Sequence, residues 1–273
     1  MSVNKKIEEK KVTTLRLQEM KNAGIKISCL TAYDALTSNI FDSAGIDMML
    51  VGDSLGNVFQ GEETTLPVTL EQTIYHTKAV VKGANRALVI ADMPFMTYQV
   101  SANEAFRNAG RLMKETGCSA IKLEGGKNVT KAIKKMNAAG IPVMGHLGLT
   151  PQSINKFGSY RARGKDPDEA KAIKDDANRL QDAGAFAVVL EKIPAELGKE
   201  ITDTLEIPTI GIGAGPHCDG QILVYTDMLG LTVDFNPRFV RQYAELNKVY
   251  SDVVEQYIDD VRTNDFPNES ESY

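Results

Sequence analysis

Each of four acidic residues stands at the end of a short apolar run of the sequence: Asp53, Asp92, Glu124 and Glu191. Such uninterrupted runs are typical of strands that are buried on both faces of a parallel sheet. The carboxyl ends of parallel strands meet on one face, where α/β proteins bind their ligands. Neighbouring carboxylates repel one another, so a set of them at that face indicates a bound cation or tuned proton chemistry.

Three of these acids form the predicted metal site. Asp53, Asp92 and Glu124 follow the second, third and fourth apolar runs. These runs are neighbours in a barrel, so the three side chains can share one coordination sphere. Carboxylate oxygens suit Mg2+, which usually keeps several waters or substrate oxygens as further ligands. The alternative is that each acid only caps the helix that follows its strand.

Three other residues at the run ends are candidates for substrate chemistry. Glu191 follows four apolar residues, roughly across the barrel from the predicted metal. It can act as a base, or it can form a structural ion pair with a lysine such as Lys192. Lys122, two residues before Glu124, shares the interior side of its strand and can bind a substrate carboxylate or form a Schiff base. His146, which ends the fifth run, can donate to a substrate oxygen or be a core histidine.

The apolar runs predict an α/β protein with a (β/α)8 barrel. Helix-period segments lie between most of the runs, and we also expect an N-terminal helix and a long amphipathic helix that begins at Pro237. The seventh and eighth runs are too close for a full crossover helix, and an open doubly wound sheet is the alternative. The eight runs are residues 26–31, 48–51, 88–91, 120–123, 143–146, 187–190, 209–212 and 222–224.

Length and composition are consistent with one enzyme domain. The 273 residues are close to the roughly 250 of a typical barrel, so residues 1–262 are predicted to form a single domain and residues 263–273 a polar, disordered tail. The net charge of −5 and the dispersed basic residues argue against nucleic acid as a partner. The sequence has neither a long apolar stretch nor a secretory leader, so we expect no membrane partner and a cytoplasmic location.

Several sequence strings, taken in order, resemble the ketopantoate hydroxymethyltransferase family. Each string alone is modest evidence, but the ordered set is specific, and the resemblance spans about residues 10–262. The chain departs from the family pattern in residues 160–165 and at Thr226, so the departures concern the folate contacts and the lid. The strings are residues 30–34, 51–56, 91–95, 122–126, 145–152, and 211–215 followed by 219–221.

The resemblance implies a barrel of the phosphoenolpyruvate/pyruvate superfamily type and a specific reaction. A hydroxymethyl group would pass from 5,10-methylenetetrahydrofolate to 3-methyl-2-oxobutanoate through an enolate stabilised by Mg2+. The product would be 2-dehydropantoate (ketopantoate), in the first step of pantothenate biosynthesis. The family also implies a homo-oligomer, a decamer built from two pentameric rings.

Family roles carry over onto individual residues. The resemblance implies that Glu191 accepts the proton and that Mg2+ is bound by Asp53, Asp92 and Glu124. It implies substrate contacts from Asp53, Ser54, Asp92, Lys122 and His146. The alternatives are a metal-dependent C–C lyase or mutase acting on another 2-oxo acid, a Schiff-base aldolase that uses Lys122, and a catalytically silent scaffold.

Overall fold

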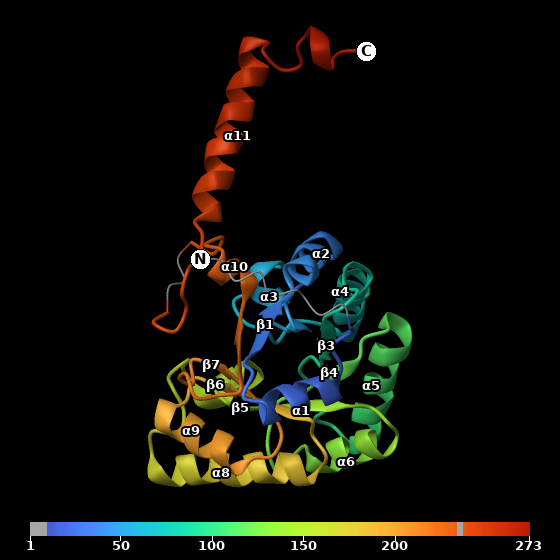
Figure 1. The fold of residues 1–273 in the computed structure, drawn as a ribbon, viewed down its shortest axis with the longest axis vertical. Helices are drawn as coiled ribbons and strands as arrows, with labels where there is room; N and C mark the ends of the chain where they lie inside the picture. The colour runs from blue at the N-terminus through green and yellow to red at the C-terminus, as the bar shows by residue number, and fades with distance from the viewer. Residues whose placement is uncertain (1–9, 234–236) are drawn as a thin grey trace. The chain divides into compact units, whose positions relative to one another are not determined.

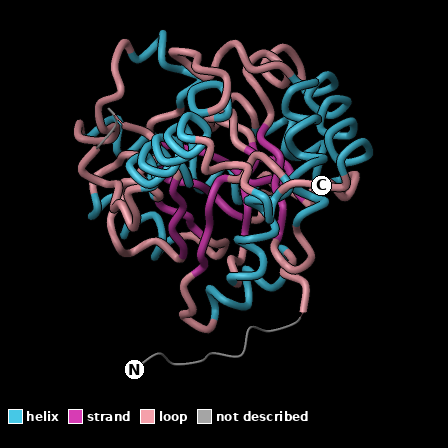
Figure 2. Tube along the Cα trace, turned by 90° about the horizontal axis from the view of Figure 1, so that it is seen from above, coloured by secondary structure: helices cyan, strands magenta, loops and turns pink. Residues whose placement is uncertain are grey.

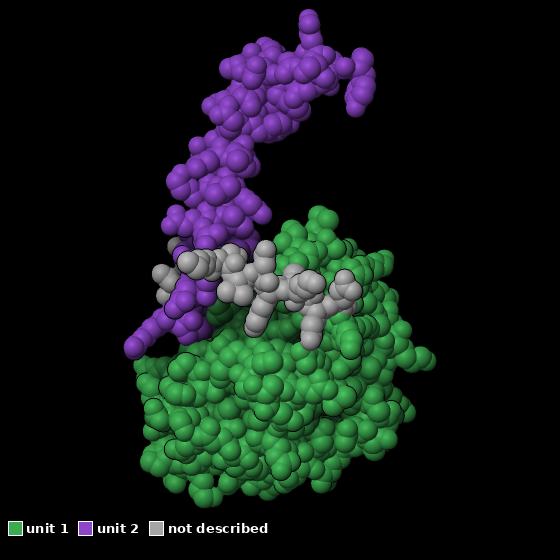
Figure 3. Space-filling model, viewed as in Figure 1, with its two compact units in different colours: residues 1–223 green, residues 224–273 purple. Residues whose placement is uncertain are grey.

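The computed structural model describes residues 10–233 and 237–273. The chain divides into two compact units, residues 1–223 and residues 224–273 (Figure 3). The first unit contains eight parallel strands that follow chain order around a closed barrel (Figure 1). Closure between β1 and β8 confirms the predicted barrel and excludes the open sheet.

The strands coincide closely with the apolar runs of the sequence. Each begins within two residues of its predicted start, and residues 213–219, between β7 and β8, contain no helix. The strands are β1 (Ile27–Thr31), β2 (Met48–Val51), β3 (Leu88–Asp92), β4 (Ala120–Lys122), β5 (Val143–Gly148), β6 (Ala187–Glu191), β7 (Thr209–Ile212) and β8 (Gly220–Leu223).

Helices surround the strands, which occupy the centre of the unit when it is seen from above (Figure 2). Local sequence fixes several helix starts. For example, Thr69 and Gln72 form a reciprocal capping box at the start of α4. The helices of this unit are α1 (Thr14–Asn22), α2 (Ala35–Ala44), α3 (Leu55–Val58), α4 (Leu70–Gly83), α5 (Ala102–Thr116), α6 (Thr130–Ala138), η1 (Pro151–Ser153), α7 (Ile154–Phe157), α8 (Pro167–Asp182) and α9 (Ala195–Thr204).

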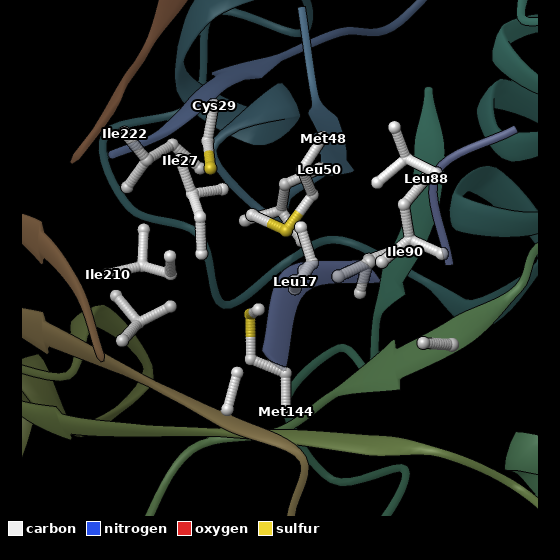
Figure 4. Packing of buried hydrophobic residues seen from close by; sticks show 14 of the residues in the cluster. Leu17, Ile27, Cys29, Met48, Leu50, Leu88, Ile90, Met144, Ile210 and Ile222 are labelled. Carbon is white, nitrogen blue, oxygen red and sulfur yellow. The ribbon is translucent and has the colours of Figure 1, made fainter. Parts of the chain in front are cut away.

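The interior of the barrel is apolar over most of its length. Alternate strand residues point inward and form one buried cluster, which also includes Leu17 and Met20 of α1. Figure 4 shows Leu17 among the strand side chains, including Met48 and Met144. The predicted N-terminal helix therefore contributes side chains to the same core as the strands.

The inward rows of side chains change from apolar to charged toward the carboxyl ends of the strands. Residues two apart on a strand face the same side, so a row that starts with an apolar core residue continues with the residue two positions later. This alternation carries four of the predicted site residues into the interior. The pairs are Ile90 and Asp92, Ala120 and Lys122, Met144 and His146, and Val189 and Glu191.

The second unit contains α10 (Tyr225–Met228), α11 (Leu246–Thr263) and η2 (Glu269–Glu271). The prediction that the long helix begins at Pro237 was wrong. The N–H groups of Tyr243 and Leu246 donate to the carbonyl oxygens of Met228 and Leu229, so this backbone turns back toward α10 instead of forming helical bonds.

No helix in the described residues is long and apolar enough to cross a membrane. The extent of a single domain, residues 1–262, and the disordered tail after it stay predictions.

Candidate active site

The predicted site residues lie at the carboxyl ends of four neighbouring strands and the loop after a fifth. Asp92, Lys122 and Glu191 end β3, β4 and β6, and His146 lies within β5. Asp53 follows β2, and Glu124 follows β4, each by two residues. Parallel pairing places Asp92 directly beside Lys122, so sequence-distant groups meet here because the strands are adjacent.

Lys122 is the central cation of the cluster. Its Nζ donates to Asp92 Oδ2 at 2.6 Å and lies 3.7 Å from Glu124 Oε1. The side chains of all three residues are buried. Burial alone would lower the pKa of Lys122, but Asp92, Glu124 and Asp53 outweigh it and raise that pKa above its ordinary value. The ammonium is therefore charged at neutral pH, which argues against a nucleophilic amine and the Schiff-base alternative.

His146 lies between two glutamates. Its Nδ1 is 3.3 Å from Glu124 Oε1, and its Nε2 is 3.4 Å from Glu191 Oε2. Burial and Lys122 lower the pKa of His146, yet the two glutamates raise it to about 9. For Glu124, burial favours the neutral acid, but His146 and Lys122 prevail and lower its pKa. The imidazolium thus connects the predicted metal ligand Glu124 to the predicted base Glu191. From the sequence, we expected the base to lie roughly across the barrel from the metal.

The carboxyl group of Asp53 has a raised pKa. Burial, followed by repulsion from Asp92 and Glu124, raises its pKa to about 8. Burial likewise raises the pKa of Asp92. The backbone N–H of Asp53 donates to Asp92 Oδ2 at 3.4 Å. With all three acids ionised, the cluster would contain more buried negative charge than Lys122 and His146 compensate, and a bound cation would relieve that excess.

The donor atoms of the acids suit a hard cation. Asp92 Oδ1 and Glu124 Oε1 are buried without a hydrogen-bond partner among the described residues. Buried oxygens rarely stay unpaired without a reason, and carboxylate oxygens are the ligands that Mg2+ prefers. Within residues 10–233 and 237–273, however, no three His, Cys, Asp or Glu side chains are already arranged to hold a metal ion. The oxygen atoms of these acids are therefore of the kind that binds Mg2+, although their side chains are not arranged around an ion.

Ser54, a predicted substrate contact, is placed next to Asp53 at the start of α3. Its hydroxyl is half-buried and lies 2.7 Å from the hydroxyl of Tyr33, which is buried. Tyr33 follows β1, so a sixth strand also contributes to this end of the barrel. Sequence reasoning assigned no role to Tyr33.

Two further polar residues reach the acids, and sequence reasoning assigned neither of them a role. Gln152 Nε2 donates to Asp53 Oδ2 at 3.0 Å, and the backbone N–H of Gln152 donates to Glu124 Oε2 at 3.1 Å. The hydroxyl of Tyr98 in turn donates to Gln152 Oε1 at 2.7 Å. Two signals were available: Gln152 ends the family-like string of residues 145–152, and it lies just after Pro151, in the turn that follows β5.

The sequence profile described as ketopantoate hydroxymethyltransferase matches residues 11–269 of this chain. The chain belongs to the ketopantoate hydroxymethyltransferase family. The match covers every element of the barrel and all of the site residues described above. The family suggested by the ordered strings is therefore confirmed.

Individual relatives agree with the family match. The 3-methyl-2-oxobutanoate hydroxymethyltransferases of Prosthecochloris aestuarii and Chlorobium phaeobacteroides are 58% and 59% identical to this chain, and each alignment covers 96% of both proteins. Among solved structures, 2,3-dimethylmalate lyase, a PEP mutase/isocitrate lyase superfamily member, superimposes with a TM-score of 0.58. It is 14% identical, with 95% of this chain and 91% of that chain covered, so it supports the fold.

Proposed function

We propose that the charged end of the barrel transfers a hydroxymethyl group to 3-methyl-2-oxobutanoate, with 5,10-methylenetetrahydrofolate as the one-carbon donor. The observation that carries this proposal is the continuous chain of contacts from Asp92 through Lys122, Glu124 and His146 to Glu191. It supplies both a place for an anionic 2-oxo acid and a nearby carboxylate base, as the family reaction requires.

Asp53, Asp92 and Glu124 are the residues that would hold Mg2+. When bound, the ion would polarise the keto group of the 2-oxo acid and so acidify the hydrogen on the neighbouring carbon. Two observations support this assignment: the oxygens of Asp92 and Glu124 that accept no hydrogen bond, and the raised pKa of Asp53.

Glu191 is the proposed base. It removes the C3 proton of the oxo acid, and the resulting enolate forms a carbon–carbon bond to the donated one-carbon unit. Tetrahydrofolate leaves, and water supplies the oxygen of the new hydroxyl group. Glu191 is partly exposed, with 16% of its side chain accessible, so substrate can reach it. His146 Nε2 lies 3.4 Å from Glu191 Oε2, and the positive charge of the imidazolium holds the carboxylate in place.

Lys122 and Ser54 are the proposed contacts for the rest of the substrate, together with Asp53, Asp92 and His146. The ammonium of Lys122 is fixed by Asp92 and is oriented for electrostatic attraction of the substrate carboxylate. The Ser54 hydroxyl is positioned by Tyr33 and can exchange this hydrogen bond for one to substrate. Each contact favours one orientation of the oxo acid, so C3 is presented to Glu191.

The test is a reconstituted reaction. The purified protein is supplied with 3-methyl-2-oxobutanoate, tetrahydrofolate, formaldehyde and Mg2+, and ketopantoate is measured by chromatography. We expect product formation that stops when a chelator is added and resumes with excess Mg2+. Cleavage or rearrangement of the oxo acid in the absence of folate would instead indicate the lyase or mutase alternative.

The homo-oligomer also belongs to this proposal. In the second unit, no side chain of α11 is buried, and its exposed apolar residues recur at helical spacing. They are Val249, Tyr250, Val253, Val254, Tyr257, Ile258 and Val261. A second copy of the chain would cover such a face. Light scattering after gel filtration measures the mass and decides whether the assembly is a decamer. The cytoplasmic location stays a prediction.

A further inference from the structure

The amide group of Gln152 uses all of its hydrogen-bonding directions inside the protein. Its Nε2 donates to Asp53 Oδ2 and to the carbonyl oxygen of Met93, each at 3.0 Å. Its Oε1 accepts from the hydroxyl of Tyr98 at 2.7 Å and from Gln99 Nε2 at 3.3 Å. The residue is 5% exposed. A buried amide that donates two hydrogen bonds and accepts two is held in one orientation.

Two of these partners determine which end of the amide faces Asp53. The carbonyl oxygen of Met93 can only accept a hydrogen bond, so the group beside it must be Nε2. The hydroxyl of Tyr98 accepts from the backbone N–H of Glu124 at 3.2 Å, so its own proton is free to point at Gln152 Oε1. The Met93 carbonyl decides the orientation, because a flipped amide would place Oε1 against it, and the Tyr98 hydroxyl is consistent with the donor end of Gln152 facing Asp53.

Gln152 also contacts a second acid of the set through its backbone. Its N–H donates to Glu124 Oε2 at 3.1 Å. Asp53 follows β2 and Glu124 follows β4, whereas Gln152 lies in η1 after β5. One residue therefore connects two carboxylates from different strands. Asp92 Oδ1 and Glu124 Oε1 remain as oxygens that accept no hydrogen bond from the described residues.

We propose that Gln152 is a positioning residue that, held by Tyr98, fixes the Asp53 carboxylate in the orientation needed for cation and substrate. The inference rests on the proposed function, because Asp53 is there a ligand and a substrate contact. Without the donor from Gln152, Asp53 Oδ2 would lose its hydrogen bond in an interior that already repels the carboxylate, and its side chain would reorient. Groups that orient a metal ligand typically affect metal affinity by about 10–100-fold.

The test is direct Mg2+ binding, measured by calorimetry in the presence of 3-methyl-2-oxobutanoate. Gln152→Met keeps the length of the side chain and removes the amide. We expect it to raise the Mg2+ dissociation constant about 10-fold or more and to lower kcat, while the KM for the folate donor stays near that of the wild type. Gln18→Met is the matched control, because Gln18 lies on α1 and donates to Glu206 O, away from the acids. It should behave as the wild type does.

A second variant keeps the inference testable if Gln152→Met fails to fold. Tyr98→Phe removes one hydroxyl from a buried ring, frees the amide to turn, and should weaken Mg2+ binding in the same direction by about 3-fold or more, since one charge-neutral hydrogen bond is lost. Its control is Tyr75→Phe, at a tyrosine that is 72% exposed. Circular dichroism establishes that each variant is folded.

The outcomes separate the two proposals. If the wild type binds Mg2+ and makes ketopantoate while a folded Gln152→Met or Tyr98→Phe binds Mg2+ within about 2-fold of it, only the positioning role is refuted. If the wild type binds no Mg2+, the proposed function fails and the inference fails with it. In a double-mutant cycle, Gln152→Met should add little to the loss caused by Asp53→Asn, because the two side chains act through one contact. Full additivity would overturn the inference.

Discussion

Lys122 and Asp92 form a buried ion pair at adjacent strand ends, with Nζ 2.6 Å from Oδ2. The side chains are 4% and 1% exposed, so neither charge has access to bulk water. Such a pair contributes little net stability when intact, because desolvation offsets the attraction, but loss of one partner leaves an uncompensated buried charge. The charge balance of the site is therefore sensitive to the loss of the Lys122 ammonium.

Lys122→Met should accordingly destabilise the metal-free protein. We expect the free energy of unfolding to fall by about 3–5 kcal/mol, because Asp92 then lacks its nearest cation and Glu124 keeps only His146 beside it. Urea denaturation followed by circular dichroism measures it. Lys199→Met, at an exposed lysine paired with Asp203, is the control and should leave stability nearly unchanged, because solvent screens an exposed ion pair. An equally small effect at Lys122 would contradict the charge balance described here.

Glu191→Gln should abolish proton removal without abolishing substrate binding. In deuterium oxide, without folate, the wild type should exchange the C3 hydrogen of 3-methyl-2-oxobutanoate, and the variant should do so at least about 100-fold more slowly, the usual range for loss of a general base. Nuclear magnetic resonance follows the exchange, and calorimetry checks that the oxo acid still binds. Glu196→Gln, on an exposed position of α9, should exchange normally. Undiminished exchange in Glu191→Gln would remove this residue as the base.

Asp53→Asn should weaken activation by Mg2+. The variant keeps the size of the side chain but loses one of the carboxylates that would hold the ion, so half-maximal activity should require at least about 10-fold more Mg2+. A metal titration of the initial rate measures this requirement. Asp203→Asn changes an exposed acid and should leave the titration unchanged. Identical titrations for Asp53→Asn and the wild type would refute the ligand role.

The position of these acids could be predicted from the sequence because strand periodicity determines it. The runs that end at Asp92 and Glu191 are apolar throughout, so their strands had to lie in a covered parallel sheet with these acids at one edge. All eight strands and the convergence of the charged residues follow from that reasoning. The metal and substrate roles of the residues stay predictions.

The partners of the acids could not be predicted, because they depend on side-chain packing between distant segments. Gln152 reaches Asp53 across 99 positions of the sequence, and nothing in the residues around it indicates that contact. The same holds for His146, whose two ring nitrogens face Glu124 and Glu191 only because β5 lies between β4 and β6. The start of α11 was also misjudged. The apolar spacing from Val240 onward is helical, but the N–H groups of Tyr243 and Leu246 donate to the backbone at the end of α10.

The raised pKa of Asp53 predicts how the stability of the metal-free protein depends on pH. In the unfolded chain this acid titrates near its usual value of about 3.9, whereas in the folded protein it titrates at about 8. The folded state therefore binds this proton more tightly. The contribution of Asp53 to stability is fully present at low pH, declines as the pH rises between these two values, and is lost above about 8.

Comparison with Asp53→Asn isolates this contribution from those of the other titrating groups. The variant has no proton to lose at this position, so its free energy of unfolding relative to the wild type should increase steadily from pH 5 to about pH 8. Urea denaturation at several pH values, in the presence of a chelator, measures the difference. Saturating Mg2+ should reduce or reverse it, because a cation favours the ionised carboxylate of the wild type. A difference that is independent of pH in the chelated protein would show that Asp53 is already ionised there, and repulsion among the buried acids could then no longer explain why the site needs a cation.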